Sequence, residues 1–270
     1  MKFVAVYTTS NGRGLDGFGH IGQYGSSRNY HRSNHTCCAI GGDITKISDY
    51  VNNIMTIHIA SYPGLHLDNI RNKRCLSGPY KGLTVTDFIF KCCADPNFSG
   101  TLANLFLCND SKLISKNENP MAKVKEYLRK LGQLYETVSG IEKVDFIILS
   151  TALHRQADFD SPSYLAKKIE FNRCLASASK NRDCYIKINN KKVAFEIIDM
   201  DRFFPVEKMK VNDFYCRGWW EAPGNKIHIR GSFLENYVVT LKKLHSNRCE
   251  KNRRKTPKNP FYYFCQININ

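Results

Sequence analysis

The amino-acid sequence predicts an α+β fold whose core is predominantly α-helical, with one β-hairpin and extended N- and C-terminal arms. Apolar residues recur at helical spacing over residues 120–139. Two segments of alternating polarity flank Asn189 and Asn190, which tolerate the positive φ of a tight hairpin turn. Six glycines fall between Gly12 and Gly25, which is too many for a compact connection. We therefore divide the chain into a glycine-rich N-terminal arm (1–42), a mainly helical core (43–250) with a hairpin near 185–198, and a basic, aromatic C-terminal arm (251–270).

Strand patterns and helix N-cap residues predict where the first elements of this fold begin. Residues 2–8 predict a strand, with Val and Tyr among their apolar positions. Helices need a polar residue at the N-cap, because its side chain accepts a backbone N–H that has no partner inside the helix. On that basis, helices are expected to start at Asp43, at Thr84 or Thr86, and at Ser99 or Thr101.

The second half of the core contains the clearest helix of the chain. Asn119 is its predicted N-cap, Pro120 fits the first helical position, and Gly140 ends it. Residues 144–149 fit either a buried strand or a buried helix. Later helices are expected to start at Ser161 and at Ser232.

Composition limits the classes of protein to be considered. The chain has 270 residues, of which 42% are hydrophobic, as expected for a globular protein. Lys and Arg number 40 against 24 Asp and Glu, which gives a formal net charge of +16. No apolar run approaches the roughly 18 residues that a membrane span needs. The apolar stretch at the N-terminus is too short for a signal peptide, so neither secretion nor membrane association is expected.

The eleven cysteines are dispersed, and no Cys-x-x-Cys pair occurs among them, which disfavours zinc ribbons and thioredoxin-like sites. Two adjacent pairs stand out, and neighbouring cysteines seldom bond to each other. One interpretation is a set of reduced, mostly buried thiols in a cell interior. The other is cross-linking between chains, for which the candidates are Cys37, Cys38, Cys92, Cys93 and Cys265.

A basic run begins the C-terminal arm. It consists of Lys251, Arg253, Arg254 and Lys255. Such a run is typical of a nuclear-import signal or a nucleic-acid patch, although a solvated helix end has the same composition. No zinc finger, RNA-recognition signature or heptad-bearing basic region accompanies it. Nucleic acid is therefore a possible partner that the sequence does not favour.

Two motifs with catalytic or cofactor chemistry are incomplete. Residues Gly12, Gly14 and Gly17 match a dinucleotide-binding fingerprint, but that fingerprint needs a helix and a βαβ unit around it, and neither is predicted. Separately, His58 and His228 resemble the histidines of two-histidine phosphoesterases. Those enzymes have a hydroxyl two residues after each histidine, where this chain has alanine and arginine.

The only cluster of metal-ligand types is equally weak. His31 and His35 lie close to Cys37 and Cys38, but adjacent cysteines make poor tetrahedral geometry. We therefore expect no metal, no cofactor and no catalytic residue, and the sequence predicts a protein that is not an enzyme.

What remains is a set of features that suits assembly: two arms, dispersed cysteines, 14 tyrosines, the basic run Lys251–Lys255 and the Asn- and Ile-rich end Gln266–Asn270. In this combination the chain resembles the occlusion-body matrix proteins of insect viruses, the polyhedrins, and among them the nudivirus polyhedrins of the crane-fly type. The resemblance implies a structural protein that self-assembles in the host cell nucleus into a crystalline occlusion body around virions. These bodies then persist outside the cell, and their partners are further copies of the chain and the virions.

Three expectations accompany this resemblance. The aromatic segment Phe261, Tyr262, Tyr263 and Phe264 would dock on a neighbouring molecule. Lysines lose their charge and tyrosines gain one near pH 10, so alkali would reverse the net charge and, together with reduction of disulfides, dissolve the lattice. At neutral pH the lattice would need to place acidic surface residues against the basic patches. The acidic residues expected there are Asp158, Asp160, Glu196, Asp199 and Asp201.

Overall fold

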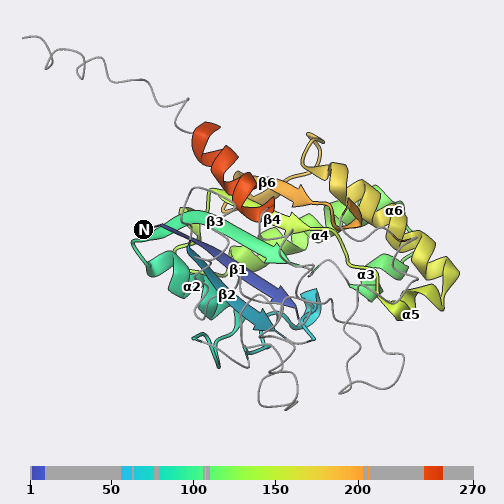
Figure 1. The fold of residues 1–270 in the computed structure, drawn as a ribbon, viewed down its shortest axis with the longest axis horizontal. Coiled ribbons are helices and arrows are strands. Elements are labelled where there is room, and N and C mark those ends of the chain that lie inside the picture. The colour runs from blue at the N-terminus through green and yellow to red at the C-terminus, as the bar shows by residue number, and fades with distance from the viewer. Residues whose placement is uncertain are drawn as a thin grey trace, which may run out of the picture.

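A computed structural model describes residues 2–9, 56–62, 64–75, 79–105, 107, 110–202, 206 and 240–251 (Figure 1). Within these residues the fold is α/β, and the prediction of a predominantly helical α+β core is wrong. A six-stranded sheet forms the centre, in the order β2-β1-β3-β4-β6-β5. Its strands are β1 (Phe3–Thr9), β2 (Thr56–Tyr62), β3 (Phe98–Leu105), β4 (Phe146–Ser150), β5 (Ile186–Ile188) and β6 (Lys191–Ile198). The helices are α2 (Val85–Ala94), α3 (Ser111–Ser115), α4 (Pro120–Tyr135), α5 (Gln156–Phe159), α6 (Pro162–Ala178) and a last helix over residues 240–251.

Five of the six strands are parallel to their neighbours, and β5 alone runs antiparallel, against β6. Parallel strands need long crossover connections, and those between β2 and β6 contain helices α2 to α6. The chain goes from β1 to one edge strand, β2, and then crosses to the other side of β1 to form β3. This makes a doubly wound sheet whose topological switch point lies between β1 and β3. It also shows that βαβ-type crossovers exist, which the sequence did not predict.

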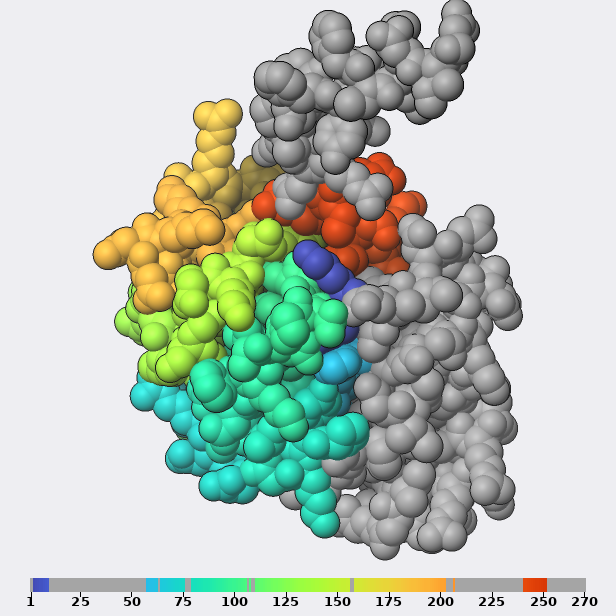
Figure 2. All heavy atoms as spheres, turned by 90° about the vertical axis from the view of Figure 1, so that its left-hand side faces the viewer, coloured from blue at the N-terminus to red at the C-terminus, as the bar shows by residue number. Residues whose placement is uncertain are grey.

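The sheet is covered on both faces. On one face, Ala5, Leu102 and Ile147 contribute to a core that also contains buried residues of α2, α4 and α6. On the opposite face, the helix over residues 240–251 contacts β3 and β4 (Figure 1). In the side view of Figure 2, the N-terminal end of β1 is visible between this last helix and the segment around α2. Residues 3–9, within the range predicted as an N-terminal arm, are therefore a central strand.

Local signals explain the elements that the sequence predicted correctly. The Thr84 side chain accepts the N–H of Asp87 at 3.2 Å and caps α2. Asn119 caps α4 by accepting the N–H of Met121 at 2.8 Å. In the hairpin, Asn189 and Asn190 have φ values of 47° and 65°, as a type I′ turn requires. Residues 144–149, which fitted either class, include most of strand β4.

One predicted helix is wrong. Residues 98–105, where a helix capped by Ser99 or Thr101 was expected, form the central strand β3. All but one of its residues are buried, so the strand shows no alternation of polarity, as is typical of parallel strands covered on both faces. The start of the helix predicted at Asp43, the start predicted at Ser232 and the C-terminal arm beyond Lys251 lie outside the described residues.

Candidate functional site

The C-terminal end of β4 leads into a segment, residues 151–158, that is held in place by helix α6. Lys168 and Asn172 lie four residues apart in α6, so they project from the same face of the helix. The Asn172 side chain forms two hydrogen bonds with the backbone of Ala152: its Oδ1 accepts the N–H at 2.9 Å, and its Nδ2 donates to the carbonyl at 2.8 Å. The Lys168 ammonium donates to the Leu153 carbonyl at 2.7 Å. This clamp fixes the backbone immediately before His154.

Lys168 also belongs to a buried ion pair. Its Nζ lies 2.5 Å from Oδ2 of Asp158, and the same oxygen accepts the backbone N–H of Arg155 at 2.7 Å. The side chains of Lys168 and Asp158 are 0% and 4% exposed. A buried pair of this kind is tolerable only because both charges have further hydrogen-bond partners. Asp158, expected on the acidic surface, is instead part of the scaffold.

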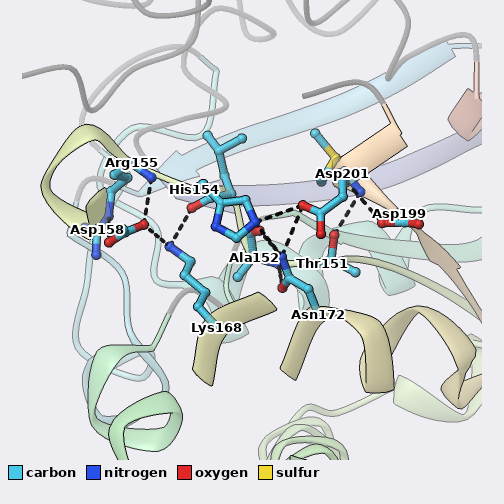
Figure 3. A network of polar contacts seen from close by, with 11 residues as sticks. Thr151, Ala152, His154, Arg155, Asp158, Lys168, Asn172, Asp199 and Asp201 are labelled. Atoms are coloured by element: carbon cyan, nitrogen blue, oxygen red, sulfur yellow. Dashed lines mark hydrogen bonds and ion pairs between the residues drawn. The ribbon is translucent and has the colours of Figure 1, made fainter. Parts of the chain in front are cut away.

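At the centre of the network, His154 pairs with Asp201 (Figure 3). Asp201 lies in a 3-10 turn, Met200–Arg202, directly after β6. Its Oδ1 is 3.0 Å from His154 Nε2, and Asn172 Nδ2 donates to the same oxygen at 3.4 Å. Because this pairing engages Nε2, the other ring nitrogen, Nδ1, is the atom left for a further partner. That atom is buried, and it has no hydrogen-bond partner among the described residues.

The ends of β4 and β6 are tied together at this point. The N–H of Thr151 donates to the carbonyl of Ile198 at 3.0 Å. In return, the Thr151 hydroxyl accepts the N–H of Met200 at 2.8 Å. These bonds extend the pairing of the two strands beyond the sheet and bring His154 and Asp201 to the same edge.

A cavity of about 380 Å³ adjoins this network. It is lined by α6 and by the turn after β6, through Ile169, Arg173, Ala176, Ser177, Lys180, Asp199, Asp201 and Arg202. The two carboxylates already have partners, since Asp201 pairs with His154 and Asp199 lies 3.6 Å from Arg202. In contrast, neither Arg173 nor Lys180 forms an ion pair with any described residue. Within the part of the chain that the structure describes, the cavity therefore offers two cationic groups, those of Arg173 and Lys180, without acidic partners.

Burial and the neighbouring Asp201 raise the pKa of Asp199. A raised pKa reflects an environment in which a further negative charge is unfavourable unless cations offset it. The Asp199 side chain also accepts the N–H of Asp201 at 3.2 Å. The carboxylates thus help to shape the turn, and the three basic residues Arg173, Lys180 and Arg202 outnumber them in the lining of the cavity.

In chemical terms, the arrangement can bind an anion and hold a proton. Arg and Lys side chains recognise phosphate and carboxylate groups through charge-assisted hydrogen bonds. A neutral histidine that donates from Nε2 to a carboxylate presents Nδ1 as an acceptor, so the Asp201 pairing also selects the tautomer of His154. Within the described residues, no group of three or more His, Cys, Asp or Glu side chains is arranged to hold a metal ion.

The structure places two of the predicted cross-linking cysteines inside the core. Cys92 and Cys93 lie in α2 and are 2% and 1% exposed. Both are free thiols. Burial raises the pKa of Cys92, and burial raises the pKa of Cys93 to about 11. Cross-linking through either cysteine would require α2 to open locally.

Of the two histidines that suggested a phosphoesterase, His58 lies in the middle of β2. Its ring stacks on Phe3 with the centroids 3.8 Å apart, and its Nδ1 lies 2.5 Å from the Tyr80 hydroxyl. Burial lowers its pKa. These contacts account for His58 as a packing residue of the sheet, away from its carboxyl edge.

Of the remaining predicted site residues, the structure describes Lys251, which is exposed at the end of the last helix. The others lie outside the described residues: His31, His35, Cys37, Cys38, His228, Arg253, Arg254, Lys255, Phe261, Tyr262, Tyr263, Phe264 and Cys265, together with Gly12, Gly14 and Gly17.

The sequence contains one signal that would have pointed to the site. Thr151 and His154 are polar residues that directly follow the apolar run of β4. In an open α/β sheet, residues just past the carboxyl ends of the strands line the ligand crevice. Because the sequence did not predict the parallel sheet, nothing marked this position as the end of a parallel strand.

Comparisons with known proteins assign no family. No family model matches the chain, and no curated protein matches it. None of the described helices is long and apolar enough to cross a membrane.

Proposed function

We propose that the protein binds a small anionic molecule, carrying a phosphate or carboxylate group, at the carboxyl edge of its sheet. The observation that carries this proposal is the cavity beside the His154–Asp201 pair, in which Arg173 and Lys180 have no acidic partner among the described residues. The location agrees with the general rule that open α/β sheets bind ligands outside the carboxyl ends of their strands.

Size and charge support the same class of ligand. A volume of about 380 Å³ is within the range of sites for small molecules and cofactors. The net charge of +16 raises the local concentration of anions around the protein. Ile169 and Ala176 add an apolar wall to the cationic one, which suits a ligand with both an anionic group and a less polar part, such as a mononucleotide.

Calorimetric titration of the full chain with inorganic phosphate, AMP and a dicarboxylate tests the proposal. We expect saturable binding of at least one of these, weakened by Arg173→Gln and by Lys180→Gln. A hydrogen bond to a charged group contributes about 1.5–3 kcal/mol, so each variant should raise the Kd roughly tenfold or more.

A matched control is available on α4. Arg129 lines a separate cavity of about 370 Å³ together with Lys125, Glu136 and Tyr185. Arg129→Gln removes the same charge from the protein and should leave the affinity unchanged. Equal weakening by Arg129→Gln and Arg173→Gln would show that only the net charge attracts the ligand, and absence of binding to all three probes would contradict the proposal.

Self-assembly into an occlusion body, with virions as partners and the nucleus as its place of formation, stays a prediction from the resemblance, as does the absence of enzymatic activity. Nucleic-acid binding is the alternative. Electron microscopy of cells that express the chain would detect crystals, and alkali with a reductant should dissolve them. Nucleic-acid binding would instead give an affinity that falls steeply with salt.

A further inference from the structure

We propose that Cys249 is a modification site: a nucleophilic thiol that His245 deprotonates and that forms a mixed disulfide with a low-molecular-weight disulfide. The site is independent of the proposed anion cavity. It lies on the helix over residues 240–251, which covers the opposite face of the sheet from α6.

The geometry brings a nucleophile, a base and an orienting group into successive contact. Cys249 Sγ lies 3.6 Å from His245 Nε2, and His245 Nδ1 lies 2.9 Å from the Thr101 hydroxyl. Cys249 and His245 are four residues apart, so one helical turn brings their side chains together. Thr101 belongs to β3 and is 2% exposed, so it anchors the imidazole from a rigid element. A nucleophile beside a base that a third group orients is the arrangement that activates thiols in proteins.

The hydrogen bonds support transfer of the thiol proton. When Nδ1–H donates to the Thr101 hydroxyl, Nε2 carries the lone pair that accepts the proton of Cys249. After the transfer both ring nitrogens carry a proton, and each still faces an acceptor: the hydroxyl oxygen on one side and the thiolate sulfur on the other. Burial lowers the pKa of His245, while the nearby Asp145 opposes that change. The imidazole is therefore neutral and able to act as a base near pH 7.

Exposure separates Cys249 from the other described cysteines. It is the exposed one, whereas Cys75, Cys92, Cys93 and Cys184 are buried and Cys174 is intermediate. Reactivity of a thiol requires both access and a route to the thiolate. Among the described cysteines, Cys249 alone is exposed, and its sulfur contacts a histidine nitrogen.

The reaction is a thiol–disulfide exchange. The Cys249 thiolate attacks one sulfur of a disulfide such as glutathione disulfide, so that a new sulfur–sulfur bond forms and the disulfide bond of the reagent breaks. The departing thiolate takes the proton that His245 received. One protein thiol and one disulfide thus give one mixed disulfide and one free thiol, and the reaction needs no further oxidant or reductant.

The test measures the rate of modification of each cysteine in the full chain. The protein is treated with excess glutathione disulfide, quenched with acid at intervals and mapped by peptide mass spectrometry. Cys174 is the internal control, because it is partly accessible and burial, with Glu170, raises its pKa. We expect Cys249 to react at least about tenfold faster than Cys174, and His245→Asn to slow Cys249 by about tenfold or more, as for a positioned general base.

Two variants of Thr101 separate orientation of the base from loss of structure. Thr101→Val keeps the shape but removes the hydroxyl, and Thr101→Ser keeps the hydroxyl. Circular dichroism verifies that each variant is folded. Slowing of Cys249 by valine and recovery by serine would support the proposal. Equal rates at Cys249 and Cys174, or a Cys249 rate that is the same in His245→Asn and in the unmodified chain, would overturn it.

Discussion

The buried pair of Lys168 and Asp158 provides the sharpest test of the scaffold beneath the anion cavity. Lys168→Met keeps the length of the side chain but removes its bonds to Asp158, at 2.5 Å, and to the Leu153 carbonyl, at 2.7 Å. Removing one member of a buried ion pair costs about 3–5 kcal/mol, because the other charge stays buried without compensation. Asp158 keeps the N–H of Arg155 at 2.7 Å, so we expect the lower end, about 3 kcal/mol.

Thermal unfolding followed by circular dichroism measures this loss. For a chain of this size, about 1 kcal/mol shifts the Tm by roughly 2–4 °C, so Lys168→Met should lower the Tm by about 6–12 °C. In the double variant with Asp158→Asn, no charge is left buried, and its destabilisation should be clearly smaller than the sum of the two single losses. A loss below about 1 kcal/mol for Lys168→Met, or strict additivity in the double variant, would refute the reasoning.

Two further predictions concern the elements that surround the site. Gly132→Ala should destabilise the protein by about 1–3 kcal/mol, because the added Cβ would clash with the Lys187 carbonyl oxygen. Helix propensity alone predicts a stabilisation of about 1 kcal/mol. The sign of the change in the free energy of unfolding, measured in urea, therefore distinguishes the two effects. Thr84→Ala should cost about 1 kcal/mol at neutral pH. Hydrogen bonds from Thr84 lower the pKa of Asp87, so this cost should shrink as the pH falls through that lowered pKa, and a cost that stays constant in acid would contradict it.

The sequence predicted the elements that are determined by neighbouring residues. Thr84 before α2 and Asn119 with Pro120 before α4 are local start signals, and the Asn189–Asn190 turn fixes its own hairpin. Each depends on contacts within a few residues, so no knowledge of the remaining chain is needed.

The parallel sheet could not be predicted in the same way. Strand β3 pairs with β1 on one side and β4 on the other, both distant in sequence. Its burial on both faces removes the alternation that identifies strands, and Ser99 and Thr101 within it resemble helix caps. Without β3 the remaining pattern favoured helices, and this led to the wrong fold class.

The candidate site was missed for a related reason. The buried face of α6 includes Leu175, but it also includes Lys168 and Asn172, polar residues that sequence patterns assign to solvent. Their burial is offset by hydrogen bonds to a backbone segment that only the folded sheet brings near.

The sheet lies between the two proposed sites, so we expect each site to act independently of the other. Asp201 and the anion cavity are built on α6, whereas Cys249 lies on the helix that covers the other face. Distant sites that share no partner perturb each other by less than about 0.5 kcal/mol. Cys249→Ser should therefore leave the ligand Kd unchanged, and Asp201→Asn should leave the reactivity of Cys249 unchanged. If ligand binding instead alters the reactivity of Cys249, linkage requires that modification of Cys249 alter ligand affinity by the same factor, and the thiol would then regulate the cavity through the sheet.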